Sequence, residues 1–204
     1  MTKHPPSTAA ARLSQLLLLA AFALTAHAAT ILNFDTDAIG TTTQFTDTVN
    51  GLSATFSSPA DPGGFEIEPS IFQALTGNVL GDPGTAFANN IPLTITFNQD
   101  LSALGAVFAT ADFGAPSPFT LTAFLGSTQV GTVSATGIVP IGFSFPEGEI
   151  AFEGSPFNSV VFSSPAPDFA IDDVAVATAP EPALNAMVGF ALICLGAVCT
   201  RRKR

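Results

Sequence analysis

The central part of the chain lacks every basic side chain. All six Lys and Arg residues and both His residues lie within the first 28 residues or the last four. All sixteen Asp and Glu residues lie between Asp35 and Glu181. Catalytic triads that need His, Schiff bases that need Lys, and His-ligated zinc are therefore excluded from the central part. Because a uniformly acidic domain repels phosphate groups, we also predict no nucleic-acid partner.

Trp and Tyr are absent as well, whereas Phe occurs 19 times. We therefore predict that buried Phe side chains supply the aromatic part of the core. Platforms that stack on sugars usually use Trp or Tyr, whose polar atoms suit a wet surface, so strong lectin-type stacking is disfavoured. The only cysteines, Cys194 and Cys199, lie in an apolar run near the C-terminus. The central domain is accordingly predicted to contain no disulfide.

Residues 1–28 are typical of a secretory signal peptide. Basic residues near the start precede an apolar run at 13–25, which is too short to span a bilayer comfortably. The small residues Ala26 and Ala28, separated by His27, form a small-x-small cleavage site. We predict that the mature chain starts at Ala29; an uncleaved N-terminal anchor is the alternative.

Residues 179–204 combine three features of a membrane-anchoring tail. Pro180, Glu181 and Pro182 hold an extended segment, because proline fixes φ and disfavours helix before it. The uncharged run 183–200 would span roughly 27 Å as a helix, close to the ~30 Å hydrocarbon core of a bilayer. A basic cluster then suits the cytoplasmic surface and stops the helix from slipping through. The cluster consists of Arg201, Arg202, Lys203 and Arg204.

This order of features resembles the PEP-CTERM sorting signal of Gram-negative bacteria. The resemblance implies that the chain is a substrate of exosortase, a membrane enzyme linked to exopolysaccharide production. The role of the sorting motif would fall on Pro180, Glu181 and Pro182. It also implies an exported precursor that is tethered to the inner membrane and then reaches the cell surface or the extracellular matrix. A plain membrane anchor without processing is the alternative.

Residues 29–178 are predicted to form one all-β domain. Turn-forming residues recur about every eight to twelve positions between stretches rich in Val, Ile, Phe and Thr. The clearest hairpin joins residues 119–125 and 128–134 across Gly126-Ser127, a sequence that suits a primed turn. These strands predict an antiparallel β-sandwich, and the second half resembles the jelly-roll domains found upstream of such tails. The other predicted strands are 31–34, 52–57, 93–97, 104–110, 142–145, 150–153, 157–163 and 169–176.

A calcium site is predicted where the first and last strands would meet. Asp172 and Asp173 lie within an apolar strand, so one carboxylate faces the apolar side and needs a partner there. The first and last strands of a jelly roll often lie side by side, which would bring Asn33 and Asp35 close. Oxygen ligands of this kind suit Ca²⁺. The alternative is that these acids occupy a bulge or a strand end and accept backbone N–H bonds.

Carboxylate chemistry, as in glycosidases, is the one catalytic chemistry that the composition leaves open. Glu66 and Glu68 would share a strand face, and Glu147, Glu149 and Glu153 lie in or near a predicted loop. We interpret these acids as solvated side chains. The sequence therefore predicts a non-catalytic protein of the cell surface or exopolysaccharide matrix. The alternative is a carbohydrate-binding module, or a carboxylate-based carbohydrate-active enzyme, on the same anchor.

Overall fold

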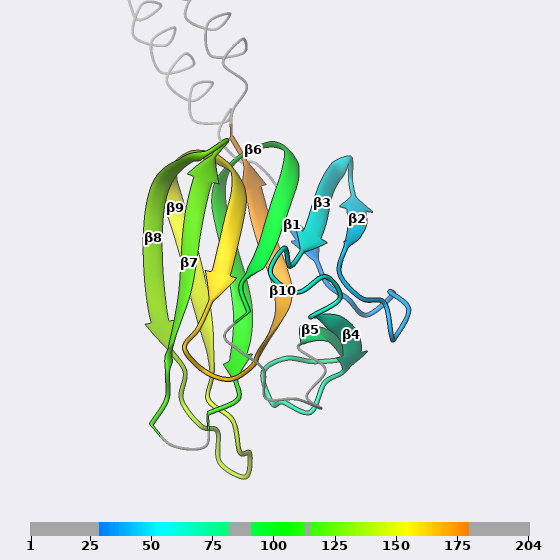
Figure 1. Cartoon of the computed structure of the whole chain (residues 1–204), viewed down its shortest axis with the longest axis vertical. Coiled ribbons are helices and arrows are strands. Elements are labelled where there is room, and N and C mark those ends of the chain that lie inside the picture. Colours follow the sequence, from blue (N-terminus) through cyan, green and yellow to red (C-terminus); the bar gives the residue numbers. More distant parts are fainter. Residues whose placement is uncertain (1–28, 82–90, 113–114, 180–204) are drawn as a thin grey trace, which may run out of the picture. The chain divides into compact units, whose positions relative to one another are not determined.

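The computed structural model describes residues 29–81, 91–112 and 115–179, which form a domain built of ten β-strands (Figure 1). None of the described segments contains a helix long and apolar enough to cross a bilayer. The predicted signal peptide, sorting motif, transmembrane segment and basic cluster lie outside the described residues. The strands are β1 (Thr30–Leu32), β2 (Phe45–Val49), β3 (Leu52–Ser57), β4 (Glu66–Pro69), β5 (Asn78–Gly81), β6 (Leu93–Thr110), β7 (Pro118–Leu125), β8 (Thr128–Thr136), β9 (Glu147–Ser163) and β10 (Phe169–Thr178).

The strand pairing is antiparallel throughout. The main hydrogen-bonded order is β4-β5-β10-β6-β9-β7-β8, while β1 pairs with β10 and β3 pairs with both β2 and β6. The predicted all-β, antiparallel fold is therefore confirmed. The predicted hairpin is also confirmed, because β7 and β8 pair across a connection whose first residue, Gly126, has a φ of 60°. Glycine adopts this left-handed region without steric cost, as a primed turn requires.

The two longest strands, β6 and β9, connect the two layers of the sandwich. The first part of β6 pairs with β3, whereas its second part pairs with β10. Between these parts the pairing of β6 with β9 shifts register twice, from Thr96 to Leu101 and from Leu101 to Ala103. Figure 1 shows β6 arching over one end of the domain at this point. Each long strand therefore contributes to both layers.

The prediction divided each of these long strands into two. The expected strands at 93–97 and 104–110 are the two parts of β6, and those at 150–153 and 157–163 belong to β9. The prediction of a strand at 142–145 is wrong, because Gly142 has a φ of 88° and a turn occupies this segment. Two short strands, β2 and β5, were not predicted, whereas β4 contains the strand face predicted for Glu66 and Glu68.

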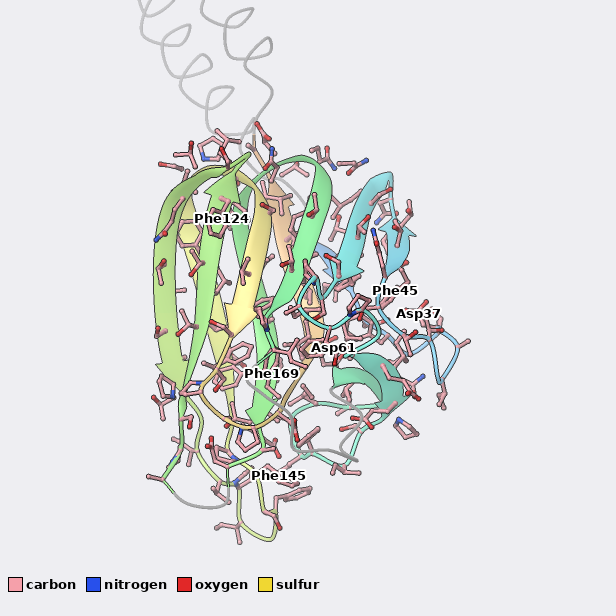
Figure 2. All side chains as sticks on the ribbon, in the orientation of Figure 1. Asp37, Phe45, Asp61, Phe124, Phe145 and Phe169 are labelled. Atoms are coloured by element: carbon pink, nitrogen blue, oxygen red, sulfur yellow. The ribbon has the colours of Figure 1, made fainter. Side chains whose placement is uncertain are left out.

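Phenylalanine fills the space between the layers, as predicted. Phe119 of β7 stacks on Phe108 of β6 with ring centroids 4.4 Å apart, and meets Phe169 of β10 edge-on at 5.1 Å. Phe162 of β9 also stacks on the ring of Phe119, with ring centroids 5.4 Å apart. Figure 2 draws the side chains of the described residues; Phe169 is labelled there, and Phe145 marks the end of the domain at which several loops gather. The seven largest fully buried side chains are Phe34, Phe56, Phe65, Phe108, Phe119, Phe157 and Phe162.

Candidate functional site

A β-bulge in β10 directs two neighbouring carboxylates into different surroundings. Asp172 pairs with Val107 and Ala175 pairs with Gly105, so β10 has one more residue than β6 in this interval. Asp173 takes up the extra length with a φ of 48°, a left-handed conformation that Asp adopts more readily than most residues. As a result Asp172 is only 2% exposed, whereas Asp173 is exposed to solvent. Bulges commonly re-aim side chains beside functional sites.

Both oxygens of the buried Asp172 carboxylate accept backbone hydrogen bonds. Oδ1 accepts one from the N–H of Asp173 at 2.7 Å, and Oδ2 accepts one from the N–H of Thr76 at 3.1 Å. The pKa of Asp172 is raised to about 6, chiefly by burial; the negative charges of Asp173 and Asp35 also raise it, while the two N–H bonds lower it. The side chain is therefore a satisfied structural group that gains a proton in mildly acidic solution.

The same loop that reaches Asp172 is held by two further carboxylates. Glu147, the first residue of β9, accepts N–H bonds from Gln73 at 2.9 Å and from Ala74 at 2.6 Å. Asp35 accepts one from Asn78 at 2.9 Å. Glu147 is only 6% exposed, so its predicted position in a solvated loop is wrong. Carboxylates from distant parts of the chain thus hold this loop through its main-chain N–H groups, a type of bond that is stronger than a neutral one.

The residues of the predicted calcium site are only partly brought together. β1 pairs with β10, with Leu32 opposite Val174, so the first and last strands do lie side by side. Asp35 lies near enough to affect the pKa of Asp172, whereas Asn33 is exposed. Within the described residues, no group of three or more His, Cys, Asp or Glu is arranged to hold a metal ion. Asp172 shows the alternative geometry, a bulge with N–H partners, and calcium binding here stays a prediction.

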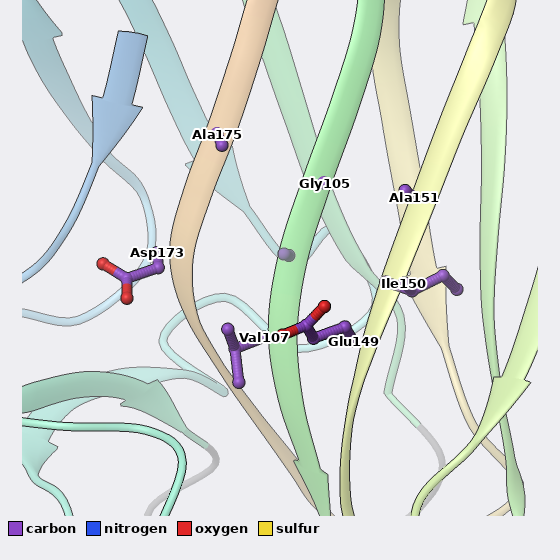
Figure 3. A pocket seen from close by; sticks show the side chains of 8 residues that line it. Gly105, Val107, Glu149, Ile150, Ala151, Asp173 and Ala175 are labelled. Atoms are coloured by element: carbon purple, nitrogen blue, oxygen red, sulfur yellow. The ribbon is translucent and has the colours of Figure 1, made fainter. Parts of the chain in front are cut away.

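A shallow pocket of about 410 Å³ lies beside the bulge, on the face of β6, β9 and β10 (Figure 3). Its floor is a row of small residues that pair directly across the three strands, Ala175 with Gly105 and Gly105 with Ala151. The depression exists because this row carries almost no side-chain volume. The next row, which includes Val107 and Glu149, borders it.

The polar groups of the pocket are two exposed carboxylates. Glu149 comes from β9 and Asp173 comes from the bulge of β10. Figure 3 shows the Glu149 side chain extending over β6 toward Val107, and Asp173 at the opposite edge beside β10. Such a site can accept hydrogen bonds from hydroxyl or ammonium groups above an apolar floor. The sequence analysis did not predict that Glu149 and Asp173 act together, because only the register of β6, β9 and β10 brings these two acids to one pocket.

The remaining acidic candidates for catalysis do not form a common site with the pocket. Glu66 and Glu68 share one face of β4, as predicted, and pair with Gly81 and Val79 of β5. Glu153 is exposed on β9. Burial raises the pKa of Glu68, and the charges of Glu66 and Asp168 raise it further. Glu147 has both oxygens bonded to the loop that precedes β5 and lies outside the pocket.

A second surface feature is an exposed apolar group of side chains in the loop between β8 and β9, which we name the apolar tip. Ile141 is 100% exposed and Ile138 is 79% exposed. In the same loop Phe145 contacts Phe72 edge-on at 5.8 Å, which ties the tip to the loop held by carboxylates. Exposed apolar groups of this kind often mark interaction surfaces. The tip consists of Ile138, Val139, Ile141 and Phe143.

The comparisons with known proteins concern the fold. The sequence matches no protein-family model and no curated protein. The K2 cleaved adhesin domain of Lys-gingipain is similar in structure with a TM-score of 0.50 at 13% identity, covering 74% of this chain and 99% of that domain. The K1 cleaved adhesin domain of Lys-gingipain from Porphyromonas gingivalis W83 has a TM-score of 0.50 at 9% identity, covering 75% and 99%.

A carbohydrate-binding module is among the more distant structural neighbours. The family 11 module of a cellulosomal cellulase from Clostridium thermocellum has a TM-score of 0.39 at 14% identity, covering 77% of this chain and 98% of that module. At such identities a structural likeness shows the fold alone. The chain therefore has the β-sandwich fold of the two adhesin domains, and its function has to be argued from its own site.

Proposed function

We propose that the chain is an exported, non-catalytic protein of the cell surface or extracellular matrix, which binds a glycan in the pocket between β6, β9 and β10. The observation that carries the proposal is the pocket itself. It combines a floor of small residues with two exposed carboxylates, Glu149 and Asp173. The sequence of the domain supplies no His, Lys, Arg or Cys that could act as a base, nucleophile or electrophile beside them.

The negative charge of the pocket excludes anionic glycans as ligands. Glu149 and Asp173 would repel anionic sugars, and residues 29–178 contain no cation to attract them. A neutral or amine-bearing polysaccharide fits, because its hydroxyl or ammonium groups donate to carboxylates while its ring lies over Gly105 and its small neighbours. The absence of Trp and Tyr points to modest affinity through repeated weak contacts, as suits a matrix component.

The C-terminal tail supplies the second part of the proposal. Residues 179–204 resemble the PEP-CTERM signal, so we propose that exosortase sorts the precursor through Pro180, Glu181 and Pro182. The intact mass of the protein recovered from cells tests this part. Loss of residues 1–28 together with the basic cluster is the expected result. A mature form that still contains Arg201–Arg204 would instead indicate a plain membrane anchor.

The binding part is tested with a panel of neutral, amine-bearing and anionic polysaccharides. We expect the full-length protein to bind a neutral or amine-bearing glycan saturably and to release no reducing ends. The variants Glu149→Gln and Asp173→Asn should weaken binding while the unfolding midpoint stays unchanged. Glu153→Gln is the matched control, because Glu153 is an exposed acid on β9 outside the pocket.

Two results would overturn the binding proposal. Release of sugar that stops in the Glu149→Gln variant would identify an enzyme. Failure to bind across the whole panel, or binding that neither pocket variant changes, would remove the pocket as the site.

A further inference from the structure

Asp168, the residue before β10, carries a buried oxygen without a partner. The residue is 8% exposed, and its Oδ1 atom has no hydrogen-bond partner among the described residues. Its position is fixed, because its main-chain carbonyl accepts a hydrogen bond from the N–H of Ala111 at 2.9 Å. A buried carboxylate of this kind needs a proton, a donor or a cation. No basic side chain exists in residues 29–178 to supply one.

A second carboxylate lies close to Asp168. Ala170 of β10 pairs with Gly81 of β5, and Gly81 pairs with Glu66 of β4, so these positions share one face of the sheet. Glu68 lies two residues further along β4, on the same face. Its Oε1 atom covers Gly81 so closely that a Cβ there would collide with it. Burial raises the pKa of Glu68, and the nearby charges of Glu66 and Asp168 raise it further.

We infer that Asp168 and Glu68 form a binding site for a divalent cation of the Ca²⁺ type, with main-chain carbonyls and water as the remaining ligands. The donors are hard oxygens, which Ca²⁺ prefers, and residues 29–178 contain no His or Cys that would favour zinc. The inference does not depend on the glycan proposal, because neither carboxylate lines the pocket.

This site differs from the one predicted from the sequence. Asp172 and Asp35 already accept backbone N–H bonds, whereas Asp168 Oδ1 has no such donor. Binding of a cation would therefore stabilise the carboxylate of Asp168 more than that of Asp172, which already has two N–H partners. Two carboxylates give a weak site, and we expect a dissociation constant of about 10⁻⁴–10⁻³ M, the range of extracellular calcium modules.

Calorimetric titration of the chelator-treated, full-length protein with CaCl₂ tests the inference, together with unfolding midpoints measured with and without the ion. We expect saturable heat and a midpoint that rises with calcium. Asp168→Asn and Glu68→Gln should each weaken calcium binding by about tenfold or more and remove the rise. Without calcium, Asp168→Asn should raise the midpoint, because it relieves the repulsion between the two carboxylates.

The variants Asp172→Asn and Glu149→Gln serve as matched controls and should keep the calcium response. If Asp172→Asn removes the response and Asp168→Asn keeps it, the cation binds between β1 and β10 and the inference is wrong. Absence of both heat and a midpoint rise in the wild type at several millimolar calcium would show that the pair binds no calcium and would overturn the inference. Should one substitution prevent folding, the other decides between these outcomes.

Discussion

Asp172 of β10 and Asp168, the residue before β10, are two buried acids whose surroundings differ. Both oxygens of Asp172 accept main-chain N–H bonds, one of them from the loop that precedes β5. Asp168 is nearly as buried, yet its Oδ1 atom has no partner among the described residues. The difference shows how a domain without basic side chains stabilises carboxylates that are buried. A buried acid whose oxygens accept main-chain N–H bonds has a structural role. A buried acid without such a donor is the one that we assign to ligand binding.

Two acids of β9, Glu147 and Glu149, lie two residues apart and also differ in their surroundings. Glu147 is buried and holds the N–H groups of Gln73 and Ala74. Glu149 is exposed and lines the pocket. β9 and β10 thus each carry one acid that fixes the fold, Glu147 or Asp172, and one exposed acid that lines the pocket, Glu149 or Asp173. The following predictions test this division, from the largest expected effect to the smallest.

The largest effect is expected where the loop meets Asp35. Gly77 has a φ of 70°, and a Cβ added there would collide with the Asp35 carboxylate that accepts the N–H of Asn78. Gly77→Ala should therefore lower the free energy of unfolding by about 3 kcal/mol, measured by urea denaturation. Gly51→Ala is the control, because Gly51 has a φ of 83° but no atom near its Cβ position. It should cost only about 1 kcal/mol; equal losses would contradict the account.

The next effect separates the two acids of β9. Glu147→Ala removes the acceptor for the N–H groups of Gln73 and Ala74, so we expect a loss of about 2 kcal/mol in the free energy of unfolding. Glu149→Ala, which removes an exposed side chain, should change it by less than about 0.5 kcal/mol. A loss at Glu149 as large as that at Glu147 would show that the pocket acid is structural too.

A smaller effect is expected from pH. The pKa of Asp172 is raised from 3.8 to about 6, chiefly by burial, so between these values the folded protein holds a proton that the unfolded chain has lost. Stability should therefore increase as the pH falls from 7 toward 4, and decrease as the pH rises through 6. Thermal unfolding at several pH values measures this. Asp172→Asn should flatten the dependence, and an unchanged slope in that variant would refute the assignment.

The smallest effect on stability is expected at the apolar tip. Ile141 is 100% exposed, so Ile141→Ser should shift the free energy of unfolding by less than about 0.5 kcal/mol. Glycan binding should be unchanged, because the tip lies outside the pocket. If Ile141→Ser abolishes glycan binding while Glu149→Gln does not, the ligand contacts the apolar tip. The assignment of Glu149 to glycan binding would then be wrong.

The parts of the fold that could be predicted are those in which local chemistry decides the structure. The hairpin across Gly126 follows from a turn sequence between two alternating strands. The pairing of the first and last strands follows from the jelly-roll resemblance. The short strands β2 and β5 could not be predicted, because at four or five residues they depend on pairing partners rather than on a local pattern. β6 was divided because the polar residues 98–100 look like a loop, although the chain stays extended while it passes between layers.

The site could be predicted only in part, for a related reason. The Asp172-Asp173 pair was singled out because charge is unusual in an apolar strand, and the bulge there explains it. The segment before β9 looked like an exposed loop because Pro146 and Gly148 flank Glu147. What buries Glu147 is a loop that lies more than seventy residues earlier in the sequence. The pocket likewise depends on the register of three strands, which no local pattern reveals.

Amide hydrogen exchange of the full-length protein, with and without a bound glycan, tests most directly whether the pocket is the binding site. The account predicts slower exchange in three separate segments that meet only in the fold, around Gly105, around Glu149–Ala151 and around Asp173–Ala175. Exchange at the apolar tip should not change. Protection confined to the tip, or to the faces of β7 and β8, would contradict the assignment of the ligand to this pocket.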